Sequence, residues 1–283
     1  MKKMFSIVLA ALMVAALLAG CGSSTAETKA PETTAAPATE AAAPAETEAP
    51  AETEAAAAFT TIEAGKLIMS TNAAFPPYEM VADDGSFEGI DVEVAGAIAQ
   101  KLGLELVIDD MDFDAALLAV QQGKSDIVMA GVTVNEDRKM VMNFSDTYSK
   151  GVQVVIVKEG SDVTLDNLGD QMIGTQRGTT GYIYASGDYG EDHVTAYDNG
   201  ASAVQALANG QVDCVIIDSA PAEAFVAANP GLAILDTEYT VEDYAIGMSK
   251  DNTALLEAVN GALKELTEDG TIPAIVEKYI PTK

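Results

Sequence analysis

The sequence predicts an α/β protein with mostly parallel sheets arranged in two similar lobes, and three observations lead to this fold class. Short apolar runs alternate with segments of helical periodicity along residues 59–283, which is the pattern of an α/β fold. A helix–glycine–strand unit occurs twice, as residues 119–128 (AVQQGKSDIV) and residues 206–215 (ALANGQVDCV). Hydrophobic residues make up 48% of the chain, enough to build a core. Such units recur in any α/β protein, so the repeat favours two lobes without excluding one.

The first half of the folded part begins with an apolar strand at residues 67–70. Apolar residues then recur at every fourth position from Ile90 to Leu102, and they predict a helix that stops at Gly103. The same alternation continues with a strand, a helix, a strand and a second helix, which are expected at residues 104–108, at residues 113–123, at residues 126–130 and from Asn135 onward.

The second half repeats this alternation after an apolar run at residues 152–157. Pro221 is expected to open a helix, because the first turn of a helix tolerates proline. The other expected elements are strands at residues 172–175, 214–218 and 244–248, helices at residues 178–186 and 201–209, and two closing helices.

The first 58 residues predict an export signal followed by a spacer. Two lysines precede an apolar run of fifteen residues from Phe5 to Ala19, which is short for a permanent membrane span of about 20 residues and typical of a secretory signal. The run ends in Leu-Ala-Gly-Cys, which resembles the lipobox of bacterial lipoproteins and implies a signal peptide at residues 1–20 and lipidation of Cys21. An ordinary signal peptide with an incidental cysteine is the alternative. Residues 21–58, rich in Ala, Glu, Thr and Pro, predict a disordered tether.

Composition excludes several classes of function. The chain has 44 acidic and 15 basic residues and a net charge of −29, so it repels phosphate backbones and nucleic acid is not an expected partner. Two cysteines and one histidine rule out a disulfide framework and an ordinary Cys/His metal site. We therefore expect no metal and no cofactor.

Candidate binding residues follow from the rule that ligands of open α/β sheets lie beyond the carboxyl ends of strands. The rule selects residues 72–78, 130–133 and 176–180, together with Asp218. Because these places fall in both expected lobes, one ligand that touches all of them must lie between the lobes. With neighbouring Phe113 and Arg138, the candidates are Asn72, Phe75, Phe113, Ala130, Gly131, Thr133, Arg138, Gln176, Thr179, Thr180 and Asp218.

These residue types suit a free amino acid. The Arg138 guanidinium and the Thr133 hydroxyl and N–H can hold a carboxylate, and Thr179 and Thr180 begin a helix whose N-terminus favours an anion. Asp218 can hold an ammonium group. Each residue also has an ordinary alternative: a solvated surface arginine, threonines that cap their own helix, and an aspartate N-cap.

The amino-acid side chain has its own candidates. Phe75 and Phe113 can flank it, and the uncharged Asn72 and Gln176 can bind its polar end. The two aromatic residues can equally be ordinary packing residues. The argument depends on convergence at several strand ends and not on any single residue.

Several separated blocks also resemble the extracytoplasmic solute-binding proteins for polar amino acids, which form bacterial solute-binding protein family 3. The blocks are AAFPPYE (residues 73–79), GIDVEVAGAIAQKLG (residues 89–103), the segment from DFDAALLAVQQGKSDIVMAG to NFSDTY (residues 112–148), GTQRGTTG (residues 174–181) and VDCVIIDSAPAEAFV (residues 212–226). The resemblance covers essentially all of the folded part.

This resemblance implies a two-lobed periplasmic-binding-protein-like fold of type II. The first lobe would comprise residues 59–150 and 249–283, and the second residues 151–248, with a two-segment hinge near residues 150–152 and 244–248. The protein would be a monomeric lipoprotein, extracytoplasmic and held to the cell membrane by its N-terminal lipid only, that delivers an amino acid to the permease of an ABC importer.

The resemblance also implies roles for single residues. Arg138 and Thr133 would hold the α-carboxylate with the Thr179 region, and Asp218 would hold the α-ammonium group. Many members, including binders of basic amino acids, have an acid at the position of Asn72, so the amide in this chain favours a polar, neutral ligand.

Two other classes of function remain open. Enzymes such as cyclohexadienyl dehydratases share this pair of lobes, and although no Ser/His/Asp or Cys/His set is available, a carboxylate-based enzyme is possible. Turnover of prephenate or arogenate would distinguish it, whereas no catalytic residue is expected in a binding protein. A ligand-sensing or purely structural lipoprotein is the other alternative.

Overall fold

The computed structural model describes residues 59–236 and 238–281. These residues fall within one compact unit of the chain, Glu52–Lys283. The expected signal peptide at residues 1–20, the lipidated Cys21 and the tether at residues 21–58 lie outside the described residues. Within the described part of the chain, no helix has the length and apolar character that a membrane crossing needs.

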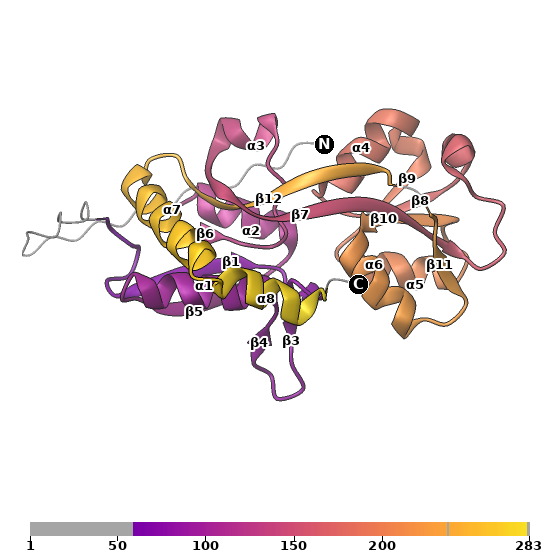
Figure 1. Cartoon of the computed structure of the whole chain (residues 1–283). Helices are drawn as coiled ribbons and strands as arrows, with labels where there is room; N and C mark the ends of the chain where they lie inside the picture. Colours follow the sequence, from indigo (N-terminus) through magenta and orange to yellow (C-terminus); the bar gives the residue numbers. More distant parts are fainter. Residues whose placement is uncertain (1–58, 237, 282–283) are drawn as a thin grey trace, which may run out of the picture. The chain divides into compact units, whose positions relative to one another are not determined.

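One nine-stranded sheet organises the described residues (Figure 1). Its strand order is β5-β1-β6-β12-β7-β10-β8-β9, with β11 paired to β7. At one end β1 pairs in parallel with β5 and β6, and at the other end β8 pairs in parallel with β9 and β10. These strands are β1 (Lys66–Thr71), β5 (Glu105–Asp110), β6 (Ile127–Val128), β8 (Ile173–Gln176), β9 (Val194–Tyr197), β10 (Cys214–Asp218) and β11 (Leu232–Ile234).

Two long strands join the two ends of the sheet. β7 (Met142–Lys158) and β12 (Thr240–Ser249) run antiparallel side by side, with Tyr244 opposite Ser149. Figure 1 shows both strands passing from the helices around β1 to the helices around β10. We call the part on the β1 side lobe 1 and the part on the β10 side lobe 2. The exact residues at which the chain crosses between lobes stay a prediction.

The helices cover both faces of the sheet in each lobe. In lobe 1, α1, α7 and α8 bury their apolar residues against one face, and α2 packs against the other. In lobe 2, α5 and α6 share one apolar cluster and α4 contributes to another. The bounds are α1 (Ile90–Lys101), α2 (Phe113–Gln121), α3 (Glu136–Val141), α4 (Thr180–Tyr189), α5 (Gly200–Ala208), α6 (Ser219–Ala228), α7 (Thr253–Glu268) and α8 (Thr271–Tyr279).

The helix–glycine–strand unit that occurs twice in the sequence has the same local structure in both lobes. Gly123 and Gly210 follow α2 and α5 with φ of 67° and 71°, a backbone region that favours glycine. Three residues later Asp126 accepts the N–H of Ile68 in β1 at 2.8 Å, and Asp213 accepts the N–H of Met172 just before β8 at 2.8 Å. Each aspartate thus ties its strand to the neighbouring parallel strand.

Most of the expected elements are confirmed, with shifted ends. β6 is reduced to two residues, and α6 begins at Ser219, so Pro221 is its third residue and not its first. The small sheet of β2 (Ala74–Phe75), β3 (Glu79–Val81) and β4 (Phe87–Glu88) was not expected, and neither were β9 and β11. Strands of two to four residues carry too little periodicity to be recognised.

Gly89 connects β4 to α1, and replacing this glycine tests the local fold. Its φ is 128°, and a Cβ there would come within 2.6 Å of the Tyr78 carbonyl carbon. We expect Gly89→Ala to lower the free energy of unfolding by about 3 kcal/mol or more, measured by urea denaturation. Gly85→Ala is the matched control, because Gly85 also has positive φ but open space around it, and about 1–2 kcal/mol is expected there. Equal losses would contradict the steric argument.

Candidate ligand-binding site

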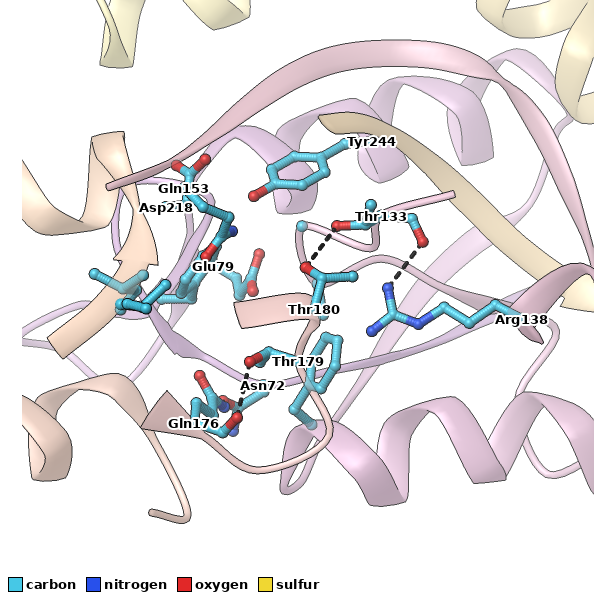
Figure 2. A pocket seen from close by; sticks show the side chains of 16 residues that line it. Asn72, Glu79, Thr133, Arg138, Gln153, Gln176, Thr179, Thr180, Asp218 and Tyr244 are labelled. Carbon is cyan, nitrogen blue, oxygen red and sulfur yellow. Dashed lines mark hydrogen bonds between the residues drawn. The ribbon is translucent and has the colours of Figure 1, made fainter. Parts of the chain in front are cut away.

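One pocket gathers all eleven residues proposed from the sequence (Figure 2). Its walls come from the strand ends and helix starts of both lobes. Five further residues complete the lining and were not among the candidates; they are Glu79, Gln153, Ile216, Ile217 and Tyr244. That these residues bind a ligand stays a prediction.

Arg138 supplies the positive charge of the pocket. Asn135 caps the short helix α3 by accepting the Arg138 N–H at 2.8 Å, and this places the arginine at the pocket. Its guanidinium donates from Nη1 to the Thr133 carbonyl at 2.8 Å and from Nη2 to the Gly178 carbonyl at 3.2 Å, and it lies 5.4 Å from the centre of the Phe113 ring. The alternative of a solvated surface arginine is therefore wrong, because Arg138 is only 7% exposed.

Among the residues that the structure describes, no anionic side chain is in direct contact with the guanidinium of Arg138. Burial lowers the pKa of the guanidinium to about 10, so it remains a cation at neutral pH, with the charge of Glu242 acting in the opposite direction. None of the ion pairs found among the described residues includes Arg138. Because burying an unpaired charge is costly, the site favours an anion that brings its own charge to Arg138.

The start of α4 faces the same region from lobe 2. Thr179 is the N-cap, and its hydroxyl accepts the N–H of Tyr182 at 3.2 Å and donates to the Gln176 carbonyl at 2.8 Å. The hydroxyl of Thr180 lies 3.4 Å from that of Thr133 in lobe 1. The first N–H groups of a helix lack intrahelical acceptors and carry partial positive charge, so this end of α4 reinforces Arg138 as an anion site.

Asp218 supplies a negative charge from the end of β10. Its Oδ1 accepts the N–H of Ala220 at 3.0 Å, and its Oδ2 accepts the N–H of Val152 at 2.8 Å. The residue is therefore both the N-cap of α6 and part of the pocket wall. Burial raises the pKa of Asp218 to about 6, against the lowering effect of the backbone donors and the Tyr244 hydroxyl. In Figure 2 Asp218 and Arg138 lie on opposite sides of the pocket.

Asn72 and Gln176 connect the lobes at another wall of the pocket. Gln176 donates from Nε2 to Asn72 Oδ1 at 2.9 Å, and Asn72 donates from Nδ2 to the Met111 carbonyl at 2.8 Å. Nearby, Gly131 has a φ of 54°, and a Cβ there would come within 2.8 Å of the Phe75 ring. Glycine at this position therefore lets the backbone after β6 lie directly against that ring.

Glu242 on β12 holds the groups around Arg138 in place. Its Oε2 accepts from the Thr133 hydroxyl and from Gln153 Nε2, each at 3.0 Å. Sequence reasoning missed this carboxylate because the apolar run that predicted the strand begins only at Tyr244. Gln153 was also missed, although it is a single polar residue within the apolar run VQVVIV, and such an interruption is a usable signal.

The structure also bears on metal binding. Within residues 59–236 and 238–281, no group of three or more His, Cys, Asp or Glu side chains has an arrangement that could hold a metal ion. The expectation that the protein needs no metal and no cofactor stays a prediction.

Known proteins resemble this chain along the folded part. Residues 67–282 match the family described as bacterial extracellular solute-binding proteins, family 3. The chain is 32% identical over 231 residues to a "probable histidine-binding protein" of Neisseria gonorrhoeae, which covers 79% of this chain and 86% of that protein. Two solved structures show an ancestral arginine-binding protein, one with glutamine bound and one with arginine bound.

The likeness to these two structures extends to the fold. The glutamine-bound structure has a TM-score of 0.74 and 38% identity, and covers 77% of this chain and 99% of that one. The arginine-bound structure has a TM-score of 0.73 and 39% identity, and covers 76% of this chain and 98% of that one. The α/β, two-lobed fold class predicted from the sequence is confirmed.

Proposed function

The chain belongs to family 3 of the bacterial extracellular solute-binding proteins, and from this premise we propose that its pocket holds one free L-amino acid for delivery to an ABC importer. The observation that carries the proposal is the pair of opposite charges in the pocket wall. Arg138 and the start of α4 suit the α-carboxylate, and Asp218 suits the α-ammonium group. A zwitterion matches both at once.

We propose that the ligand binds to lobe 1 first and that lobe 2 then closes over it. Arg138 and Thr133 belong to lobe 1, whereas Thr180 and Asp218 belong to lobe 2, so a ligand that contacts all four joins the lobes. Closure of this kind is a hinge motion known from periplasmic binding proteins. Exclusion of water strengthens the charged contacts, and the ligand favours the closed form by its higher affinity for that form. The importer can then distinguish a loaded protein by its shape.

Location and partners follow from the family. The protein is extracytoplasmic, and some of its relatives are named as binding proteins of ABC transporters, which implies permease partners. We propose in addition that residues 1–20 are removed, that Cys21 carries the lipid and that the protein acts as a monomer on the tether of residues 21–58. Its relatives are named as binding proteins, and we propose that this chain likewise catalyses no reaction.

A thermal-shift panel of the twenty amino acids tests the proposal. At a ligand concentration 100 times the dissociation constant, binding stabilises a protein by about 2.7 kcal/mol, which raises Tm by roughly 5 °C or more for a domain of this size. We expect at least one polar L-amino acid to give this shift and its D-enantiomer to give a smaller one. No shift with any amino acid, or turnover of prephenate or arogenate, would contradict the proposal.

A further inference from the structure

Glu242 is a buried carboxyl group beside the pocket, and the proposed zwitterion leaves it without a role. It lies on β12, in the long antiparallel pair of strands that joins the two lobes, and it is 5% exposed. Among the described residues, its Oε1 is buried and has no hydrogen-bond partner. A buried carboxylate with an unsatisfied oxygen costs free energy, so stability does not account for an acid at this position.

The other oxygen of Glu242 occupies two donors of the pocket wall. Its Oε2 accepts from the Thr133 hydroxyl and from Gln153 Nε2, each at 3.0 Å, and both of these residues line the pocket. A hydroxyl group has one proton to donate, and an ionised carboxylate can only accept. While the Thr133 hydroxyl donates to Glu242, it cannot donate to the carboxylate of an amino acid. Glu242 therefore occupies a donor at the place where that carboxylate is proposed to lie.

The negative charge of Glu242 acts on the same place. Thr133 contacts Glu242 through its hydroxyl and Arg138 Nη1 through its carbonyl, the latter at 2.8 Å, so one residue lies between the acid and the cation of the pocket; Figure 2 shows Thr133 beside Arg138. Burial has the largest effect on the pKa of Arg138 and on that of Asp218, and the charge of Glu242 raises both. The acid thus stabilises the cationic Arg138 and repels another anion that approaches it.

Two roles for Glu242 give opposite expectations for binding. If the acid only held Thr133 and Gln153 in a productive arrangement, its removal would disturb these donors and weaken binding. If it competes with the amino acid for them, its removal frees the Thr133 hydroxyl and ends a repulsion, and binding becomes tighter. The unsatisfied Oε1 and the single proton of Thr133 favour competition.

We propose that Glu242 limits the affinity of the pocket, because it competes with the α-carboxylate of the amino acid for the Thr133 hydroxyl and for the charge of Arg138. The inference rests on the proposed function, since it assumes that the α-carboxylate lies beside these two residues. The incoming carboxylate must displace Glu242 from the hydroxyl or bind without this donor. Affinity is then lower than the donors alone would give, and this favours release of the amino acid to the importer.

Glu242→Gln tests the sign of this effect, because glutamine keeps the size of the side chain and removes its charge. Calorimetry of the wild type and the variant, with each L-amino acid that stabilises the wild type in the thermal-shift panel, gives the two dissociation constants. We expect the variant to bind about fivefold more tightly or better, since one donor is freed and a repulsion is removed. Most of this gain should come from slower dissociation, measured by stopped-flow fluorescence.

The α-carboxamides of the same amino acids separate competition for the carboxylate from a general change of the pocket. A carboxamide is neutral, so the charge of Glu242 does not repel it, although it can still accept from the freed hydroxyl. Glu242→Gln should therefore improve carboxamide binding less than carboxylate binding, and the preference for the carboxylate should rise. An equal gain for both compounds would show that the variant reshapes the pocket, and it would overturn the inference.

Asp243→Asn is the matched control, because Asp243 is the next residue of β12, is exposed and pairs with Lys150 at 3.2 Å. It removes the same charge and should bind like the wild type. Glu242→Ala is a second neutral variant, for use if Glu242→Gln does not fold by circular dichroism, and it should also bind more tightly. Unchanged or weaker binding, or failure of both variants to fold, would overturn this inference and leave the proposed function intact. Failure of every amino acid to bind the wild type would overturn the proposed function, and this inference with it.

Discussion

Arg138→Ala is expected to abolish amino-acid binding that calorimetry can measure. The guanidinium is the buried cation of the pocket wall, and it donates to backbone carbonyls of Thr133 in lobe 1 and Gly178 in lobe 2. A charge-assisted contact with a carboxylate contributes about 1.5–3 kcal/mol for each hydrogen bond, and a bidentate contact makes two of them. Losing both lowers affinity by roughly 10²–10⁴-fold, because 1.4 kcal/mol corresponds to a factor of ten.

Two further variants separate charge from geometry in this experiment. Arg138→Lys keeps the charge but loses the planar pair of donors, so an intermediate affinity is expected. Arg177→Ala is the matched control, because Arg177 is exposed and pairs with Asp198 at 2.9 Å. It should bind like the wild type. We expect the Tm of ligand-free Arg138→Ala to stay near that of the wild type, and retained binding in this variant would remove the carboxylate assignment.

Asp218→Asn is expected to have the second largest effect on binding while the fold is retained. The two aspartate oxygens accept the N–H groups of Ala220 and Val152 at 3.0 Å and 2.8 Å. Asparagine has a single acceptor oxygen, so it keeps only one of these bonds, but it remains a good N-cap for α6. The variant therefore loses the negative charge for the ligand's ammonium group and one hydrogen bond from the backbone. We expect a fall of about 10²-fold in affinity by calorimetry.

The pH dependence of the wild type tests the same residue. The pKa of Asp218 is raised to about 6 in the folded protein from its ordinary 3.8, chiefly by burial. A protonated Asp218 cannot attract an ammonium group, so affinity should fall as the pH is lowered through about 6. Asp91, with a pKa of about 6, titrates in the same range. Asp218→Asn should therefore show a weaker decline than the wild type.

The stability of the ligand-free protein should change with pH in the direction opposite to its affinity. Because the folded state holds the proton of Asp218 more tightly than the unfolded state, the stabilisation that comes from its protonation is fully present below about pH 4 and is lost as the pH rises through 6. At pH 7 the ionised, buried group lowers the stability of the ligand-free protein. Asp218→Asn removes this charge but also one backbone hydrogen bond, so we expect its Tm without ligand to stay within a few degrees of the wild-type value.

Asp213→Asn is the control for this measurement. Asp213, like Asp218, accepts a backbone N–H with its carboxylate, here that of Met172 at 2.8 Å. It is exposed and does not line the pocket. Its replacement should change neither the affinity nor the pH profile. An Asp218→Asn protein that binds as tightly as the wild type at pH 7 would show that the ammonium group is held elsewhere.

The sequence by itself determined the elements and most of the pocket. Every fourth residue of α1 is apolar, and glycines follow α2 and α5, so these helices could be placed to within a few residues. The ends of helices and the alternation of residues in strands depend on residues only a few positions away in the sequence. The strand-end rule then found Thr133, Gln176 and Asp218, because parallel strands in one sheet bring their carboxyl ends to the same edge.

Tertiary structure alone decided how the charges of the pocket are paired. Glu79 begins a strand of three residues, and no local pattern shows that it is fully buried or that neither of its oxygens accepts a hydrogen bond from the described residues. Likewise Glu242 meets Thr133 across 109 positions of the chain. Whether a carboxyl group is solvated, paired or left to keep a proton depends on residues brought to it by the fold, and periodicity carries no information about such distant neighbours.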